Sequence, residues 1–157
     1  YLRAIDAIRD PGNLGTLLRT ALAAGVQAVV ILPTSADPYS PKVVRSAMGA
    51  HFRLPLLIQD WDAFEQLVHP PDPAKRLSVF LAEVDEGRPY WQADFTRPCA
   101  LIISNEAAGT SPPARRLADL HVHIPMPGRF ESLNAAVAGA ILMFEVVRQR
   151  TPLGEIS

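Results

Sequence analysis

Short apolar runs alternate with segments of helical periodicity along almost the whole chain, and this alternation constrains the fold most strongly. The apolar runs are continuous and often β-branched, as in strands that helices cover on both faces. Strands are predicted at residues 2–8, 28–32, 54–58, 77–82, 100–103 and 122–124. Helices are predicted at residues 14–24, 41–48, 60–68 and 133–150. The sequence therefore predicts an α/β fold with a largely parallel sheet flanked by helices.

Capping residues predict where several of these helices begin and end. Asn13 is suited to the N-cap of the first helix and Gly25 to its end. Ser40 with Pro41 opens the second helix, and Asp60 caps the third. The last helix begins after Ser132, another natural N-cap residue.

The predicted last helix is apolar around much of its circumference. One face carries an apolar stripe made of Leu133, Ala136, Val137, Ala140, Ile141, Phe144 and Val147. The opposite face is also mostly non-polar in its first turns, with Ala135, Ala138, Gly139 and Leu142. Such a helix is either buried in the monomer or packed against another subunit.

The length of 157 residues suits a single domain, 1–157, and we find no linker or repeat. Because the chain begins at Tyr1 rather than Met, an accessory N-terminal domain outside these residues stays open. No apolar run approaches the ~18 residues of a membrane span, and no secretory leader is visible, so we expect a soluble, cytoplasmic protein. The lone Cys99 adjoins an apolar run and is interpreted as a buried small hydrophobe.

The net charge of −1 does not by itself indicate nucleic-acid binding. Any basic footprint must therefore be local, and the alternative is a set of scattered solubilising charges. The candidates are Arg9, Arg19, Arg45, Arg53 and Arg129.

Three loops follow predicted strands and carry polar residues that folding alone does not require. The first of them is formed by residues 10–20. Its two glycines and the helix N-terminus let backbone approach an anion such as an RNA phosphate. Arg19 lies off the apolar stripe of this helix, where its guanidinium could hold a phosphate or carboxylate at two points. The alternative is a capped helix with a solvated arginine.

The second loop, residues 104–110, places Glu106 at the mouth of a buried strand, where a carboxylate is either capping or functional. The third loop, residues 123–134, contains Ser132 and Asn134. Asn134 is a poor helix former in an alanine-rich stretch, which favours a role for its side chain. In α/β sheets, ligands gather at the carboxyl ends of strands, so the three loops are expected to lie together.

The three loops resemble, in order and character, the motifs of the SpoU (TrmH-like) branch of the SPOUT RNA methyltransferases. The matching segments are residues 10–15 with Arg19, residues 104–106 with Gly109, and residues 124–126 followed by 132–134. The resemblance spans roughly residues 8–150, nearly the whole chain.

The resemblance implies an α/β-knot fold with a C-terminal trefoil knot, a homodimer joined through the first and last helices, and S-adenosylmethionine as methyl donor, without a metal. The activity implied is methylation of a ribose 2′-hydroxyl in structured RNA. Ribosomal RNA is favoured over transfer RNA, because no long basic terminal extension is present.

The resemblance also assigns roles to individual residues. The catalytic residues it implies are Arg19, Asn13, Glu106, Ser132 and Asn134. The cofactor-binding residues are Ser104, Asn105, Gly109, Ile124, Met126 and Leu133. The RNA-binding residues are Arg9, Arg19, Arg45 and Arg129.

One residue departs from the family pattern. Ser104 stands where the family commonly has glycine, and its side chain could crowd the donor.

Three rival hypotheses stay open: a relative that binds RNA without methylating it, a base methyltransferase, and a dinucleotide-dependent oxidoreductase. The absence of a three-glycine fingerprint in the first loop argues against the last.

Overall fold

The computed structural model describes residues 1–105, 109–128 and 131–152. Within these ranges, seven strands form one sheet in the order β3-β2-β1-β6-β4-β7-β5, and the paired neighbours run parallel. The strands are β1 (Leu2–Asp6), β2 (Ala28–Ile31), β3 (Leu56–Ile58), β4 (Ser78–Glu83), β5 (Arg88–Pro89), β6 (Cys99–Ser104) and β7 (Leu120–His123). The predicted α/β fold with a largely parallel sheet is confirmed.

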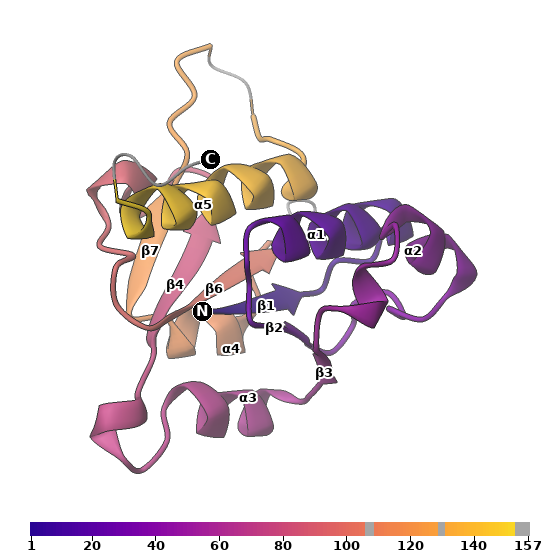
Figure 1. The fold of residues 1–157 in the computed structure, drawn as a ribbon. Helices are drawn as coiled ribbons and strands as arrows, with labels where there is room; N and C mark the ends of the chain where they lie inside the picture. The colour runs from indigo at the N-terminus through magenta and orange to yellow at the C-terminus, as the bar shows by residue number, and fades with distance from the viewer. Residues whose placement is uncertain (106–108, 129–130, 153–157) are drawn as a thin grey trace.

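Helices cover both faces of this sheet, with α1 and α5 on one side and α3 and α4 on the other (Figure 1). Their bounds are α1 (Pro11–Ala23), α2 (Pro41–Ser46), α3 (Trp61–Val68), α4 (Pro112–Leu117) and α5 (Ala135–Arg150). Short 3-10 turns are η1 (Ala50–Phe52), η2 (Pro73–Lys75) and η3 (Tyr90–Gln92). The sequence analysis did not predict α4, β5 or these turns.

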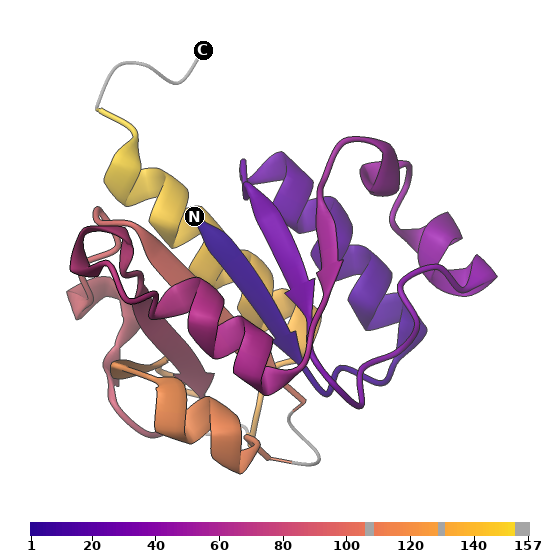
Figure 2. The ribbon, with the colours of Figure 1, turned by 90° about the horizontal axis from the view of Figure 1, so that it is seen from below.

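The core has two parts, one on each face of the sheet, because neighbouring strand residues point to opposite faces. In β2, Val29 and Ile31 belong to the cluster that packs against α1 and α5. Val30 belongs to the cluster that packs against α3 and α4. Seen from below, α3 and α4 cross in front of the strands (Figure 2). The sheet is thus buried on both faces, as its continuous apolar runs predict.

Helix α1 begins earlier than the sequence indicated. Its N-cap is Asp10, whose Oδ1 accepts a hydrogen bond from the Asn13 backbone N–H at 2.7 Å, and Pro11 takes the first helical position. Proline suits that position because its fixed φ is already helical and its missing N–H needs no partner. The prediction that Asn13 caps the helix was wrong. Gly25, with φ 69°, follows the helix end as expected.

Helix α5 corrects one further expectation. Its N-cap is Asn134 rather than Ser132, and the Asn134 side chain accepts hydrogen bonds from the N–H groups of Ala136 and Val137. Two members of the apolar stripe, Val137 and Phe144, are each 49% exposed. The buried side consists of Ala135, Ala136, Gly139, Leu142, Met143, Glu145 and Val146. Periodicity could not choose between two apolar faces.

Cys99 is buried, as predicted, and burial raises the pKa of its thiol, which suits an inert core residue. None of the helices in the described ranges combines the length and the hydropathy that a membrane span requires. The strand order reverses between β1 and β6, and in such open α/β sheets ligands bind outside the carboxyl ends of the strands. The trefoil knot stays a prediction.

Candidate active site

A cavity lies at the carboxyl ends of β4, β6 and β7, between the sheet and the first turns of α5. Its empty volume is about 740 Å³, part of it open to solvent. All six residues to which the sequence analysis gave a cofactor role line it: Ser104, Asn105, Gly109, Ile124, Met126 and Leu133. Ser132 also lines this cavity. The second and third loops therefore meet in one place, although they are separate in the sequence.

The end of β6 is fixed by a buried carboxylate that the sequence analysis missed. Asp6 is 1% exposed and lies opposite Ser104 in the pairing of β1 with β6. The Ser104 hydroxyl donates to Asp6 Oδ2 at 3.0 Å, and the Ser111 backbone N–H donates to the same oxygen at 3.3 Å. The side chain that was expected to crowd the donor is therefore hydrogen-bonded to the neighbouring strand. Only the strand pairing could have revealed this contact.

The first and third loops meet through two asparagine side chains. Asn134 Nδ2 donates to Asn13 Oδ1 at 3.0 Å, across 121 positions of sequence. Asn134 Oδ1 at the same time caps α5. The side-chain role expected for Asn134 is therefore partly structural, and it joins the N-terminal turns of α1 and α5.

Three of the four arginines predicted to act on RNA do not line this cavity. Arg19 is exposed on α1, six residues beyond Asn13, which corresponds to about 9 Å along the helix axis. Arg9 and Arg45 are exposed as well. Within the part of the chain that is described, the residues around the cavity include none of these three. Two further predicted residues, Glu106 and Arg129, lie outside the described residues.

Gly109 has φ 70°, in the left-handed region that favours glycine, and it lines the cavity wall after the second loop. A residue with a Cβ atom at this position would strain the backbone that borders the cavity. The glycine at position 109 thus has a physical reason. From the sequence, a role for Gly109 followed only from the family resemblance.

A charged cluster, which was not predicted from the sequence, borders the cavity at the end of β4. Glu83, at the end of β4, accepts a hydrogen bond from the Thr110 hydroxyl at 2.9 Å and pairs with Arg115 at 3.0 Å. Arg115 also pairs with Glu86 at 2.9 Å, and this hydrogen bond lowers the Glu86 pKa. His121 lies 3.4 Å from Glu83.

Glu83, Glu86 and His121 are close enough together to suggest a cation site. The Arg115 guanidinium, however, pairs with both carboxylates and offsets one of their two negative charges, so the cluster already holds a cation of its own. We interpret it as a polar wall of the cavity. Only Glu83 and Arg115 of this cluster, with Thr110, line the cavity itself.

These observations define an α/β protein with a mostly apolar small-molecule cavity at the carboxyl edge of a parallel sheet. The chain belongs to the SpoU rRNA Methylase family, whose model matches residues 3–144. The resemblance stated from the three loops is thereby confirmed at the level of the family.

Individual relatives agree with this assignment. The chain is 39% identical over 142 residues to 23S rRNA (guanosine(2553)-2′-O)-methyltransferase RlmP of Bacillus subtilis, covering 90% of this chain and 56% of that protein. It is 37% identical over 154 residues to 23S rRNA (uridine(2479)-2′-O)-methyltransferase of Streptomyces viridochromogenes, covering 92% of this chain and 51% of the relative. The chain thus spans about half the length of the curated relatives it matches.

Solved structures extend the comparison. The SpoU methyltransferase AviRb from Streptomyces viridochromogenes, in complex with the cofactor AdoMet, superposes with a TM-score of 0.90 and 35% identity over 96% of this chain and 57% of that one. The AdoMet-bound rRNA methyltransferase from Sinorhizobium meliloti gives a TM-score of 0.85 and 34% identity over 96% of this chain and 56% of that one.

Proposed function

We propose that this chain transfers the methyl group of S-adenosylmethionine to a ribose 2′-hydroxyl of structured RNA, with ribosomal RNA favoured over transfer RNA. One observation carries the proposal: the six residues expected to bind the donor line a single cavity. Family membership supports the reaction class, and the names of the relatives in Bacillus and Streptomyces support ribosomal RNA.

The cavity suits the proposed donor in its chemistry, because small-molecule sites are usually lined by apolar side chains with a few polar groups. Ile103, Val122, Ile124 and Leu142 offer apolar surface for an adenine ring. Glu83 and Arg115, paired with each other at 3.0 Å, give the cavity a polar wall beside this apolar surface. When bound, S-adenosylmethionine supplies an electrophilic methyl group on a sulfonium.

The residues of this chain would mainly position the reactants and stabilise charge. The Ser104 hydroxyl is held by Asp6, which leaves the backbone at the end of β6 to contact the donor. We assign Arg19 the binding of the target phosphate and the stabilisation of the developing alkoxide, because a guanidinium stays protonated in proteins and makes a poor general base. Asn13 and Asn134, joined to each other, would orient the RNA-facing side of the site together with Ser132 and Glu106.

We propose further that the protein acts as a homodimer in the cytoplasm and that residues 1–157 form one methyltransferase domain. The exposed apolar side chains of α5, Val137 and Phe144, support a subunit contact through this helix. Helix α1 packs beside α5, so a partner seated on α5 would also approach α1 and its exposed Arg19.

The test is incubation with S-adenosylmethionine labelled in its methyl group and separate pools of ribosomal and transfer RNA. We expect label in ribosomal RNA, and nuclease digestion should place it on a ribose 2′-oxygen. Label on a base would support a base methyltransferase instead. Label in neither pool, with no calorimetric binding of the donor, would contradict the proposed activity.

A further inference from the structure

Four large apolar side chains are exposed between residues 39 and 52, the segment that contains α2 and η1. Phe52 is 91% exposed, Met48 69%, Tyr39 57% and Val44 40%. We call Tyr39, Val44, Met48 and Phe52, with the exposed cations Lys42, Arg45 and Arg53 of the same segment, the α2–η1 surface. Neither the cavity nor the exposed face of α5 accounts for it.

The backbone of this segment holds the apolar side chains outward. Helix α2 ends at Ser46, and Met48 and Gly49 follow with φ values of 52° and 83°. The left-handed conformation costs a residue with a side chain about 1–2 kcal/mol, so Met48 is held there by its surroundings. The His51 ring packs against Tyr39 at 5.7 Å between centroids and contacts the Pro38 carbonyl oxygen at 2.6 Å. The surface is therefore a built feature of the fold.

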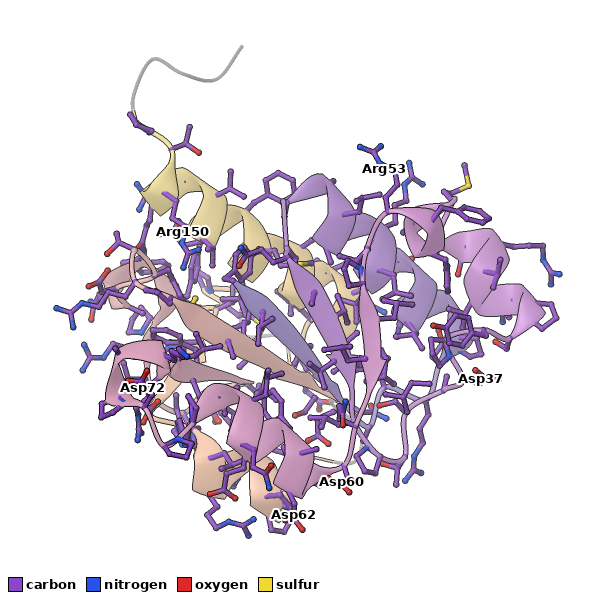
Figure 3. All side chains as sticks on the ribbon, turned by 60° about the horizontal axis from the view of Figure 1, so that its bottom comes forward. Asp37, Arg53, Asp60, Asp62, Asp72 and Arg150 are labelled. Atoms are coloured by element: carbon purple, nitrogen blue, oxygen red, sulfur yellow. The ribbon has the colours of Figure 1, made fainter. Side chains whose placement is uncertain are left out.

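The charge of this segment is distinct from that of the chain as a whole. Residues 38–59 contain three cations, Lys42, Arg45 and Arg53, and no Asp or Glu, which gives +3 in a protein of net charge −1. Arg53 projects outward from the ribbon (Figure 3). The nearest preceding carboxylate in the sequence, Asp37, accepts a hydrogen bond from the Tyr39 backbone N–H at 2.9 Å. Aromatic side chains interleaved with cations are typical of surfaces that bind single-stranded nucleic acid.

The α2–η1 surface is attached directly to the helix that carries Asn13 and Arg19. A Cβ atom at Gly15 would lie 1.6 Å from the Ser46 side chain and 2.9 Å from the Val43 carbonyl, so α1 and α2 touch at Gly15. Arg19 follows Gly15 by four residues and is therefore its neighbour on the surface of α1. Arg19, Arg45 and Arg53 are exposed cations on or beside these packed helices.

We propose that the α2–η1 surface binds an unpaired segment of the substrate RNA, with a base stacked on Phe52 and phosphates held by Arg45 and Arg53. This inference rests on the proposed function, because it takes RNA as the substrate. Every base has a π-face, so the stacking needs no particular sequence. The segment would grip RNA beside the methylation site and lower KM without touching the donor.

A second protein chain is a poorer fit for this surface than RNA. The centre of a protein–protein contact is depleted of charged side chains, whereas here Arg45 and Lys42 flank Val44 on the same short helix. A polyanion gains from both components, because its phosphates match the cations and its bases match the aromatic rings.

The test measures fluorescence anisotropy of the full chain with a labelled RNA hairpin that carries an unpaired loop, and with a blunt RNA duplex. Phe52→Ala should weaken hairpin binding about 5- to 150-fold, with a smaller change for the duplex. Phe52→Leu should remain weak, since it keeps apolar area without a ring, and Phe52→Trp should restore binding. Arg53→Ala should lower the slope of log affinity against log salt by about 0.7.

Matched controls lie elsewhere on the molecule. Trp91→Ala removes another exposed aromatic, 52% exposed, and Arg116→Ala removes an exposed cation of α4; both should bind RNA like the unchanged chain. Calorimetric affinity for S-adenosylmethionine should stay the same in every variant, which also shows that each is folded.

Three outcomes would overturn the inference. Hairpin binding by Phe52→Ala equal to that of the unchanged chain would remove the stacking role while leaving the proposed function intact. A change of oligomeric state in Phe52→Ala, seen by light scattering, would assign the surface to a second copy. Absence of both RNA binding and methyl transfer in the unchanged chain would instead refute the proposed function itself.

Discussion

The donor cavity and the exposed arginine face of α1 differ in how far a single chain completes them. The cavity is closed in by residues from β4, β6, β7 and α5, and its key strand end is fixed by the buried Asp6. Arg19, in contrast, is exposed and lies about 9 Å along α1 from the Asn13–Asn134 contact. One region is a preformed pocket, and the other is an open helix face, on which the proposed contact with RNA depends.

This difference teaches that donor binding and methyl transfer should respond separately to substitution. Changes in the cavity should alter donor affinity first, whereas changes on α1 should alter the transfer step.

Arg19→Ala should produce the largest effect. Loss of the guanidinium removes the proposed stabilisation of the alkoxide, so we expect kcat for RNA methylation to fall about 10²- to 10³-fold. Calorimetric affinity for S-adenosylmethionine should stay unchanged, because Arg19 does not line the cavity. Arg19→Lys keeps the charge but loses the two-point contact; near-normal turnover in that variant would end the phosphate-clamp role.

Ala138→Phe should instead lower the affinity for the donor. Ala138 lines the cavity from α5, and a larger side chain there would occupy donor space. Overpacking of this kind costs about 1–3 kcal/mol, so donor affinity should fall about 5- to 150-fold by calorimetry. Val137→Ala, on the neighbouring exposed position, is the control. Unchanged affinity in Ala138→Phe would show that the donor binds elsewhere.

Ser104→Ala should act on stability more than on the donor. The substitution removes the hydroxyl that donates to Asp6 and should lower the free energy of unfolding by about 1–2 kcal/mol, measured by urea denaturation. Donor affinity should change less than about twofold, because the hydroxyl contacts β1. Ser35→Ala removes a longer contact, 3.3 Å to the Ile5 carbonyl, and should cost less. A large loss of donor affinity in Ser104→Ala would mean that the hydroxyl binds the donor.

Glu145→Gln should have the smallest effect, a loss of stability that depends on pH. Hydrogen bonds from Arg148 and Gln149 outweigh burial and lower the Glu145 pKa below 4.5. A lowered folded-state pKa contributes stability above the unfolded value that is lost as pH falls through the folded value. Glu145→Gln should therefore destabilise the chain at pH 7, and this effect should begin to fade near pH 4.5 and vanish once the pH is below the lower, folded-state pKa. The effect is small because the Arg148 side chain is 66% exposed. Thermal unfolding across this pH range checks it; a destabilisation that persists in acid would contradict the ion-pair origin.

The sequence predicted the elements and the residues around the cavity better than the contacts between them. Apolar runs placed the strands, and the three loops pointed to the residues from Ser104 to Leu133 that line one cavity. Helix caps were harder to predict, because each helix start offers two candidate residues close together in the sequence. Asp10 and Asn13 are the candidates for α1, and Ser132 and Asn134 are the candidates for α5. Local preference is similar for all four residues, so tertiary packing decided.

Other features depend on strand order or helix rotation and could not be derived locally. The Asp6–Ser104 contact exists because β1 pairs with β6, and the Glu83–Arg115 pair exists because α4 lies beside β4. The core side of α5 could not be chosen from the sequence, since both of its faces are apolar. The exposure of Phe52 was not predicted, because the sequence of a short turn does not show whether an apolar residue in it is buried or exposed.

The most direct test is a crystal structure of this chain grown with S-adenosylmethionine. We predict density for the donor in the cavity bordered by Ser104, Ile124 and Leu133, with Arg19 outside direct contact with it. Donor bound at any other place, or a cavity that stays empty at saturating donor, would contradict the claim that these loops build the methyl-donor pocket.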